Sequence, residues 1–191
     1  MNIRRIMATG AAAGLLLVGL PTAAQADDVV RNGSYTVPAG TTIEGNLTVR
    51  NGTLTIHGTV EGNVSHTGTG WVLVTRSGQV DGNLTDTGSG GIKVAGDVDG
   101  NVTESGRGNV EVTATGDVSG NVIERDAGNL TIRSEVDGNV TEGGSGHLVL
   151  GRNARVDGNV EEHSSGNLYV YRGARVEGDI SESGSGSRVN R

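Results

Sequence analysis

A five-residue unit that returns at nearly constant spacing constrains this chain more than any other feature. Its clearest copy is Val136-Asp137-Gly138-Asn139-Val140, and edited copies run from Ile43 to Ile180. The glycines of the unit stand at positions 45, 62, 82, 100, 120, 138, 158 and 178, so successive copies are 17, 20, 18, 20, 18, 20 and 20 residues apart. Self-similarity with this period indicates a structure of stacked, similar turns.

Apolar residues between the copies follow the parity of β-strands. Steps of 8, 2, 6 and 4 residues separate Val102, Val110, Val112, Val118 and Val122. Even steps place side chains on one face of an extended chain, and glycine-rich segments between the strands mark corners. The pattern predicts an all-β fold, a right-handed parallel β-helix (β-solenoid) of about eight rungs of 17–20 residues. An antiparallel sandwich is the alternative, but it does not explain the regular return of one unit.

The N-terminal residues have the form of an export signal. A basic start, Met1-Asn2-Ile3-Arg4-Arg5, precedes an apolar run and the small-residue site Ala24-Gln25-Ala26. We therefore expect a secretory signal peptide over 1–26, a lead-in strand and cap over 27–42, the solenoid over 43–183 and a tail over 184–191. An uncleaved anchor is disfavoured because the apolar run is shorter than the roughly 20 residues of a membrane span. Twin-arginine export is disfavoured by the residues around Arg4-Arg5. The expected location is secreted or at the cell envelope, with no transmembrane segment after signal cleavage.

Composition excludes several functions. The chain has no cysteine, which removes disulfides and thiolate metal sites. The net charge is -7 with both signs interspersed, which argues against nucleic acid as a partner. Catalysis would need unlike residues gathered at one place, whereas this chain spreads similar residues over every rung, so we expect neither an enzyme nor a cofactor. The histidines, at 57, 66, 147 and 163, do not form a three-ligand zinc set.

Polar residues of the repeat form columns. Asparagines stacked at strand spacing can hydrogen-bond along the stack, and one such structural ladder is expected from Asn46, Asn63, Asn83, Asn101, Asn121, Asn139 and Asn159, ending at Asp179. The unit glycine, such as Gly138, is expected where the wall bends, because a side chain there would crowd the narrow interior.

Carboxylates form two further columns. One comprises Glu61, Asp81, Asp99, Asp137, Asp157 and Glu177, and the other comprises Asp86, Glu104, Glu124, Glu142, Glu162 and Glu182. Like charges in register repel, so we expect both columns to be solvated and offset by scattered arginines. Calcium, which takes six to eight oxygen ligands, is the alternative, although the glycine-aspartate nonapeptide of calcium β-rolls is missing.

Aromatic residues are scarce, and those on the wall are candidates for contact with a ligand or partner. Tyr169 and Tyr171 alternate with inward Leu168 and Val170 and are followed by Arg172, while Trp71 lies near the other end. Such residues could hold a sugar or a partner loop. An ice-binding face is a further alternative, but its row of threonines is interrupted at Ile123 and Glu161.

The segment Gly173-Ala174-Arg175-Val176-Glu177-Gly178-Asp179-Ile180, like every Val-x-Gly-Asn-Val unit, resembles the bactofilin-like, polymer-forming β-solenoid proteins. The resemblance covers about 43–183. It implies a right-handed solenoid without cofactor or nucleotide that assembles end to end into filaments. Two features depart from that family: bactofilins work inside the cell, whereas this chain has an export signal, and its units carry Asn where the family often has Asp.

Terminal rungs of a solenoid expose unpaired strand edges, which invite pairing with another copy. The sequence therefore predicts an exported, non-catalytic β-solenoid with a structural or self-assembling role at the cell envelope or outside the cell. Its expected partner is a second copy of the chain, end to end. The alternative is a surface adhesin or polysaccharide-binding module that contacts cell-wall material through the aromatic residues.

Overall fold

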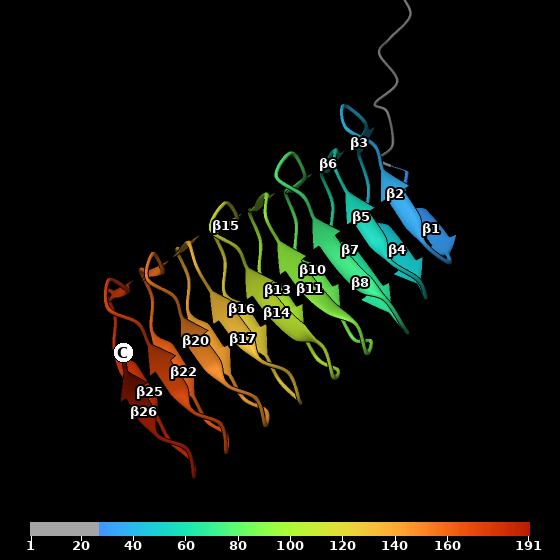
Figure 1. Cartoon of the computed structure of the whole chain (residues 1–191). Helices are drawn as coiled ribbons and strands as arrows, with labels where there is room; N and C mark the ends of the chain where they lie inside the picture. The colour runs from blue at the N-terminus through green and yellow to red at the C-terminus, as the bar shows by residue number, and fades with distance from the viewer. Residues whose placement is uncertain (1–26) are drawn as a thin grey trace, which may run out of the picture.

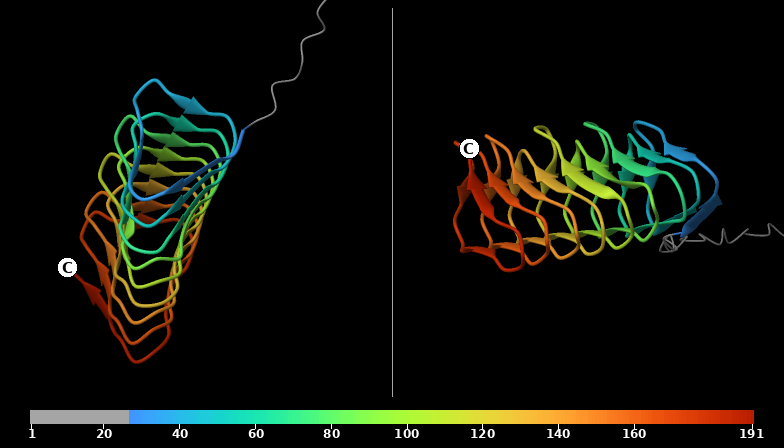
Figure 2. Two further views of the ribbon diagram at one scale, coloured as in Figure 1. Left: turned by 90° about the vertical axis from the view of Figure 1, so that its right-hand side faces the viewer. Right: turned by 60° about the horizontal axis from the view of Figure 1, so that its bottom comes forward.

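The computed structural model describes residues 27–191, and the predicted signal peptide lies outside them. Over this range the chain winds into a solenoid in which three parallel sheets run along the rod, with one strand from each turn in each sheet (Figure 1). The turns stack in sequence order, so the first and last described turns lie at opposite ends of the rod (Figure 2). The predicted all-β solenoid is confirmed.

The strands are short and each sheet collects every third one. Sheet A contains β1 (Val29–Asn32), β4 (Leu47–Arg50), β7 (Val64–Thr67), β10 (Leu84–Asp86), β13 (Val102–Glu104), β16 (Val122–Glu124), β19 (Val140–Glu142), β22 (Val160–Glu162) and β25 (Ile180–Glu182). Sheet B contains β2 (Tyr35–Val37), β5 (Leu54–Ile56), β8 (Trp71–Val74), β11 (Gly91–Val94), β14 (Asn109–Val112), β17 (Leu130–Ile132), β20 (Leu148–Leu150), β23 (Leu168–Val170) and β26 (Arg188–Asn190). Sheet C contains β3 (Thr42–Ile43), β6 (Thr59–Val60), β9 (Gln79–Val80), β12 (Asp97–Val98), β15 (Asp117–Val118), β18 (Glu135–Val136), β21 (Arg155–Val156) and β24 (Arg175–Val176).

Inward side chains form the core as continuous columns. In sheet A, Leu84, Val102 and Val122 are in register, and sheets B and C carry similar columns. The valines at 102, 110, 112, 118 and 122 are all fully buried, which confirms the interpretation of the even steps. Because every turn repeats these positions, the core is a thin aliphatic filling along the whole rod.

The repeated unit is the corner between sheets C and A. Val136 ends β18, Val140 begins β19, and Gly138 lies between them. A Cβ on Gly138 would stand 2.6 Å from the carbonyl carbon and oxygen of Gly120 in the preceding turn. The corner therefore needs glycine, but the crowding predicted in the interior arises instead between the backbones of adjacent turns.

The alternation of longer and shorter turns has its origin at the corner between sheets B and C. Residues 113–116 connect β14 to β15, and this corner is closed by a hydrogen bond from the Gly116 amide to the Thr113 carbonyl, 3.1 Å long. In the next turn Arg133 and Ser134 alone make the connection between β17 and β18. The two-residue difference is thus confined to one corner, as the sequence predicted.

Both ends contain more regular structure than their sequences suggest. The lead-in segment forms a complete first turn, because β1, β2 and β3 pair with β4, β5 and β6. Arg31 is in register with inward Val49 but is exposed at the end of the rod, and its guanidinium carbon lies 4.9 Å from the centre of the half-buried Tyr35 ring. At the other end, the expected tail contains β26, which pairs with β23.

Within residues 27–191, no helix has the length and apolar character that crossing a membrane requires.

Candidate functional site

An asparagine ladder runs along the corner between sheets C and A. The backbone amide of Asn121 and its Nδ2 both donate to Oδ1 of Asn101, at 2.8 and 2.9 Å, and Asn139 donates to Asn121 in the same way. The same pattern joins Asn46, Asn63, Asn83 and Asn101, while Asn159 and Asp179 donate through the backbone amide alone. Asp28 accepts both hydrogen bonds of Asn46 at the start of the ladder. The asparagines are therefore occupied with one another.

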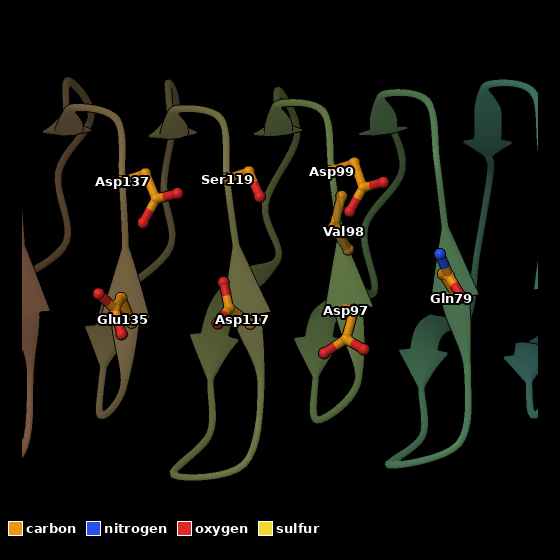
Figure 3. Close-up of a pocket in the computed structure, with 8 residues that line it drawn as sticks. All are labelled: Gln79, Asp97, Val98, Asp99, Asp117, Ser119, Glu135 and Asp137. Atoms are coloured by element: carbon orange, nitrogen blue, oxygen red, sulfur yellow. The ribbon is translucent and has the colours of Figure 1, made fainter.

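The outer surface of sheet C is acidic. Asp97, Asp117 and Glu135 form one row, and Asp99, Ser119 and Asp137 form the next (Figure 3). Together with Gln79 and Val98 they line an open hollow of about 510 Å³. Partial burial, followed by the neighbouring carboxylates, raises the pKa of Asp117 above its usual range. The two rows therefore concentrate negative charge on one face of the rod.

A basic side chain already lies at the tightest group of these carboxylates. Glu135, Asp137 and Asp157 can bring one oxygen each to within 4.8 Å of one another, and they are the only such metal-ligating group within residues 27–191. Arg155 Nε lies 3.4 Å from Glu135 and 3.1 Å from Asp157, and its Nη2 lies 3.1 Å from Glu177. The guanidinium thus supplies positive charge where a metal ion would bind.

The second carboxylate column contradicts the prediction of a solvated row. Its members Asp86, Glu104, Glu124, Glu142 and Glu162 are fully buried, and Glu182 in the last turn is half-buried. The cause is strand parity, because Glu104 stands two residues after inward Val102 and so faces the same way. That spacing was visible in the sequence and outweighs the expectation that charged residues face solvent.

His66 is a buried titratable residue that spacing alone did not identify. It is fully buried in the same column, with Nδ1 2.9 Å from Oδ1 of Asp86 and Nε2 2.8 Å from the carbonyl oxygen of Gly52. The hydrogen bond to Asp86 raises the pKa of His66. Both ring nitrogens face acceptors, so the site favours the imidazolium paired with the Asp86 carboxylate.

The two tyrosines have different surroundings. Tyr169 stacks edge-on against His147, its hydroxyl accepts from Nδ2 of Asn167 at 3.1 Å, and the Arg191 guanidinium carbon lies 4.4 Å from its ring centre. Tyr171 instead lines an open hollow of about 330 Å³ with Arg133, Arg152 and other residues of the sheet B to sheet C corners. The Tyr171 hydroxyl also accepts a hydrogen bond from Arg191 Nη1, 3.5 Å long, so both tyrosines are half-buried, whereas Arg172 beside Tyr171 is exposed.

Trp71 does not join this group. It lies on β8, and four strands of sheet B, namely β11, β14, β17 and β20, separate it from β23. A Cβ on Gly91 would stand 3.1 Å from the Trp71 ring, so the missing side chain in the next turn leaves room for the indole. With 39% of its surface exposed, Trp71 remains partly accessible but is separated from the tyrosines.

Comparison with known proteins supplies one match. The bactofilin family, described as polymer-forming cytoskeletal, matches residues 35–127. Among curated proteins and solved structures, none matches the chain. The matched residues span the first turns of the solenoid, from β2 to the corner after β16.

Proposed function

We propose that this β-solenoid, which is similar to the polymer-forming bactofilin family over residues 35–127, is a structural subunit that polymerises end to end. The observation that carries this proposal is the incomplete burial of the last turn. Val170, Val176 and Ile180 are half-buried, whereas Leu150, Val156 and Val160, which occupy the same columns one turn earlier, are fully buried.

The edges of the sheets point to the same contact. Within residues 27–191, β24, β25 and β26 have no strand beyond them at one end, and β1, β2 and β3 have none at the other. Unpaired edges form hydrogen bonds with another chain when nothing blocks them. A second copy placed on the last turn would complete the burial of the half-buried apolar side chains and pair these strands.

Electron microscopy and light scattering on the purified protein test the proposal. We expect filaments whose mass grows with protein concentration. Ile180→Lys, which puts a charge in the end column, should shorten them or abolish them. Ser181→Lys is the matched control, because Ser181 is the exposed neighbour on β25 and should leave assembly intact. Monomers at every concentration and salt level tested would refute end-to-end assembly.

We also propose that the subunit acts outside the cytoplasm, at the cell envelope or beyond it. The support is the signal-peptide pattern of 1–26, with its small-residue site at Ala24-Gln25-Ala26. Fractionation of the host and mass spectrometry of the purified protein test this location. We expect a chain that begins at Asp27 in the extracytoplasmic fraction, and an uncleaved chain confined to the cytosol would contradict the proposal.

A second candidate function, adhesion to polysaccharide, is favoured by the hollow that Tyr171 lines. An aromatic ring beside Arg133 and Arg152 presents a stacking surface and donors for acidic or hydroxylated sugars. We expect Tyr171→Ala and Arg152→Ala to weaken co-sedimentation with cell-wall glycan if this function holds. Thr36→Ala, on the outer face of sheet B near the other end, is the control. Unchanged binding by Tyr171→Ala would remove the main support for this candidate.

A further inference from the structure

The buried carboxylates form one continuous column at the corner between sheets A and B. Strand pairing places Asp86, Glu104, Glu124, Glu142 and Glu162 in register in successive turns. Neighbouring strands lie about 4.8 Å apart, so each of these glutamates has a carboxyl group directly above and below it, while Asp86 has His66 on one side. Buried carboxylates are rare unless they are paired, and this repetition therefore needs a physical explanation.

One oxygen of each glutamate is satisfied by the glycine-rich corner that follows it. Oε1 of Glu104 accepts from the backbone amides of Gly106 and Gly108, at 3.0 and 3.2 Å. Oε1 of Glu142 accepts from Gly144 and Gly146 in the same way, at 3.1 and 3.2 Å. These contacts fix the orientation of the carboxyl groups and turn the second oxygen toward the column.

The second oxygens have no hydrogen-bond partner. Oε2 atoms of Glu104, Glu124, Glu142 and Glu162 are buried and unpaired, as is Oε1 of Glu182. A row of ionised carboxylates would then combine mutual repulsion with the loss of hydration. If neighbours share protons, each unpaired oxygen becomes either a donor or an acceptor, and the column satisfies itself.

Among residues 27–191, no basic side chain forms an ion pair with these glutamates. The inward residues of sheet B in these turns are apolar, namely Val110, Val112, Leu130, Ile132, Leu148 and Leu150. On the corner segments, the side chains of Arg107, Arg125, Asp126 and His163 are exposed, and Ser164 is the buried neighbour of Glu162. His66 lies at the N-terminal end of the column, where it pairs with Asp86.

We propose that Glu104, Glu124 and Glu142 form a proton-sharing ladder inside the rod, which holds protons at neutral pH and makes the solenoid less stable as the pH rises. This proposal goes beyond end-to-end assembly, since it concerns the interior of a single chain and holds whether or not filaments form.

The direction of the pH dependence follows from the titration of the column. Burial, followed by contact with Glu142, raises the pKa of Glu124 to about 8, and burial also raises the pKa of Glu104 and Glu142. In the unfolded chain these groups ionise near the ordinary value of 4.5. The folded state therefore binds more protons between these values, and stability that is fully present below 4.5 is lost as the pH rises through about 8. His66, whose pKa is also raised, contributes in the same direction.

Two measurements on the full chain test the ladder. Infrared spectroscopy of the folded protein at pH 7 should show protonated carboxyl groups, which disappear on unfolding. The urea midpoint should fall as the pH is raised from about 5 to about 9. Glu124→Gln, which imitates a protonated carboxyl group, should weaken the infrared signal and reduce the pH-dependent shift of the midpoint.

Asp81→Asn is the matched control, because it removes one exposed carboxylate from the same rod and should keep the shift of the parent. If Glu124→Gln does not fold, the proposal is still tested by the infrared signal of the parent protein and by the release of protons when the parent protein unfolds. The absence of protonated carboxyl groups at pH 7 would overturn the proposal. A midpoint that depends on added sodium, potassium or calcium at fixed pH, with no proton release, would overturn it too and assign the column to cations.

Discussion

At the scale of single residues, the unit glycines determine how closely two turns approach. We expect Gly138→Ala to destabilise the solenoid by about 1–3 kcal/mol, because the new Cβ would force the Gly120 carbonyl away. Denaturant melts would measure the change. Gly143→Ala is the control, since the nearest atom to its Cβ would be the Glu124 carbonyl oxygen at 3.6 Å, an ordinary contact. Equal stability of the two variants would show that the turns can separate at the corner without cost.

The spacing of residues along a strand predicted which side chains are buried better than the polarity of those side chains did. Val102 and Val110 were assigned to the core from their spacing, and both are fully buried. Glu104 has the same parity as Val102 but was expected in solvent because it carries charge. The amides of Gly106 and Gly108, which make its burial feasible, come from the backbone of a corner. The spacing of residues along the sequence does not show that these backbone amides point toward the Glu104 carboxyl group.

At the scale of secondary-structure elements, the asparagine ladder joins the corners of successive turns. We expect Asn121→Ala to cost about 1–2 kcal/mol, because it removes the Nδ2 donor to Asn101 and the acceptor for two hydrogen bonds from Asn139. Thermal melts would measure the loss. Ser119→Ala, two residues earlier and exposed, should be nearly neutral. If both variants melt alike, the ladder contributes no stability.

The strands and corners followed from the sequence for a simple reason. Apolar residues recur at even steps along the strands, and the corners between strands are rich in glycine. Because the repeat shows both features in every turn, one irregular turn such as 43–60 does not obscure the pattern. The ends were harder to predict. Tyr35 and Arg188 do not resemble the residues of the repeat. Spacing puts Arg188 where the next inward residue is due, but only the pairing of Tyr35 with Leu54 and of Arg188 with Leu168 shows that both belong to complete strands of the stack.

At the scale of the whole molecule, each turn contacts only the turns before and after it, so stability is a sum over neighbours. The last turn has one neighbour and incompletely buried apolar residues. We therefore expect amide hydrogens of β25 to exchange faster than those of β13 and β16 in the monomer. Hydrogen-exchange mass spectrometry would measure this difference, and filament formation should reduce it. Uniform protection along the monomer would contradict nearest-neighbour stacking.

The asparagine column also gives the rod freedom in its length. Removal of residues 102–121 would place Val122 on Leu84 where Val102 lies now, and Asn139 would donate to Asn101 in place of Asn121. Every other column would keep its order, because the unit at each corner is interchangeable with the next. Gain or loss of one genetic segment of about twenty codons can therefore lengthen or shorten this protein by one step of about 4.8 Å, leaving the remaining contacts as they were.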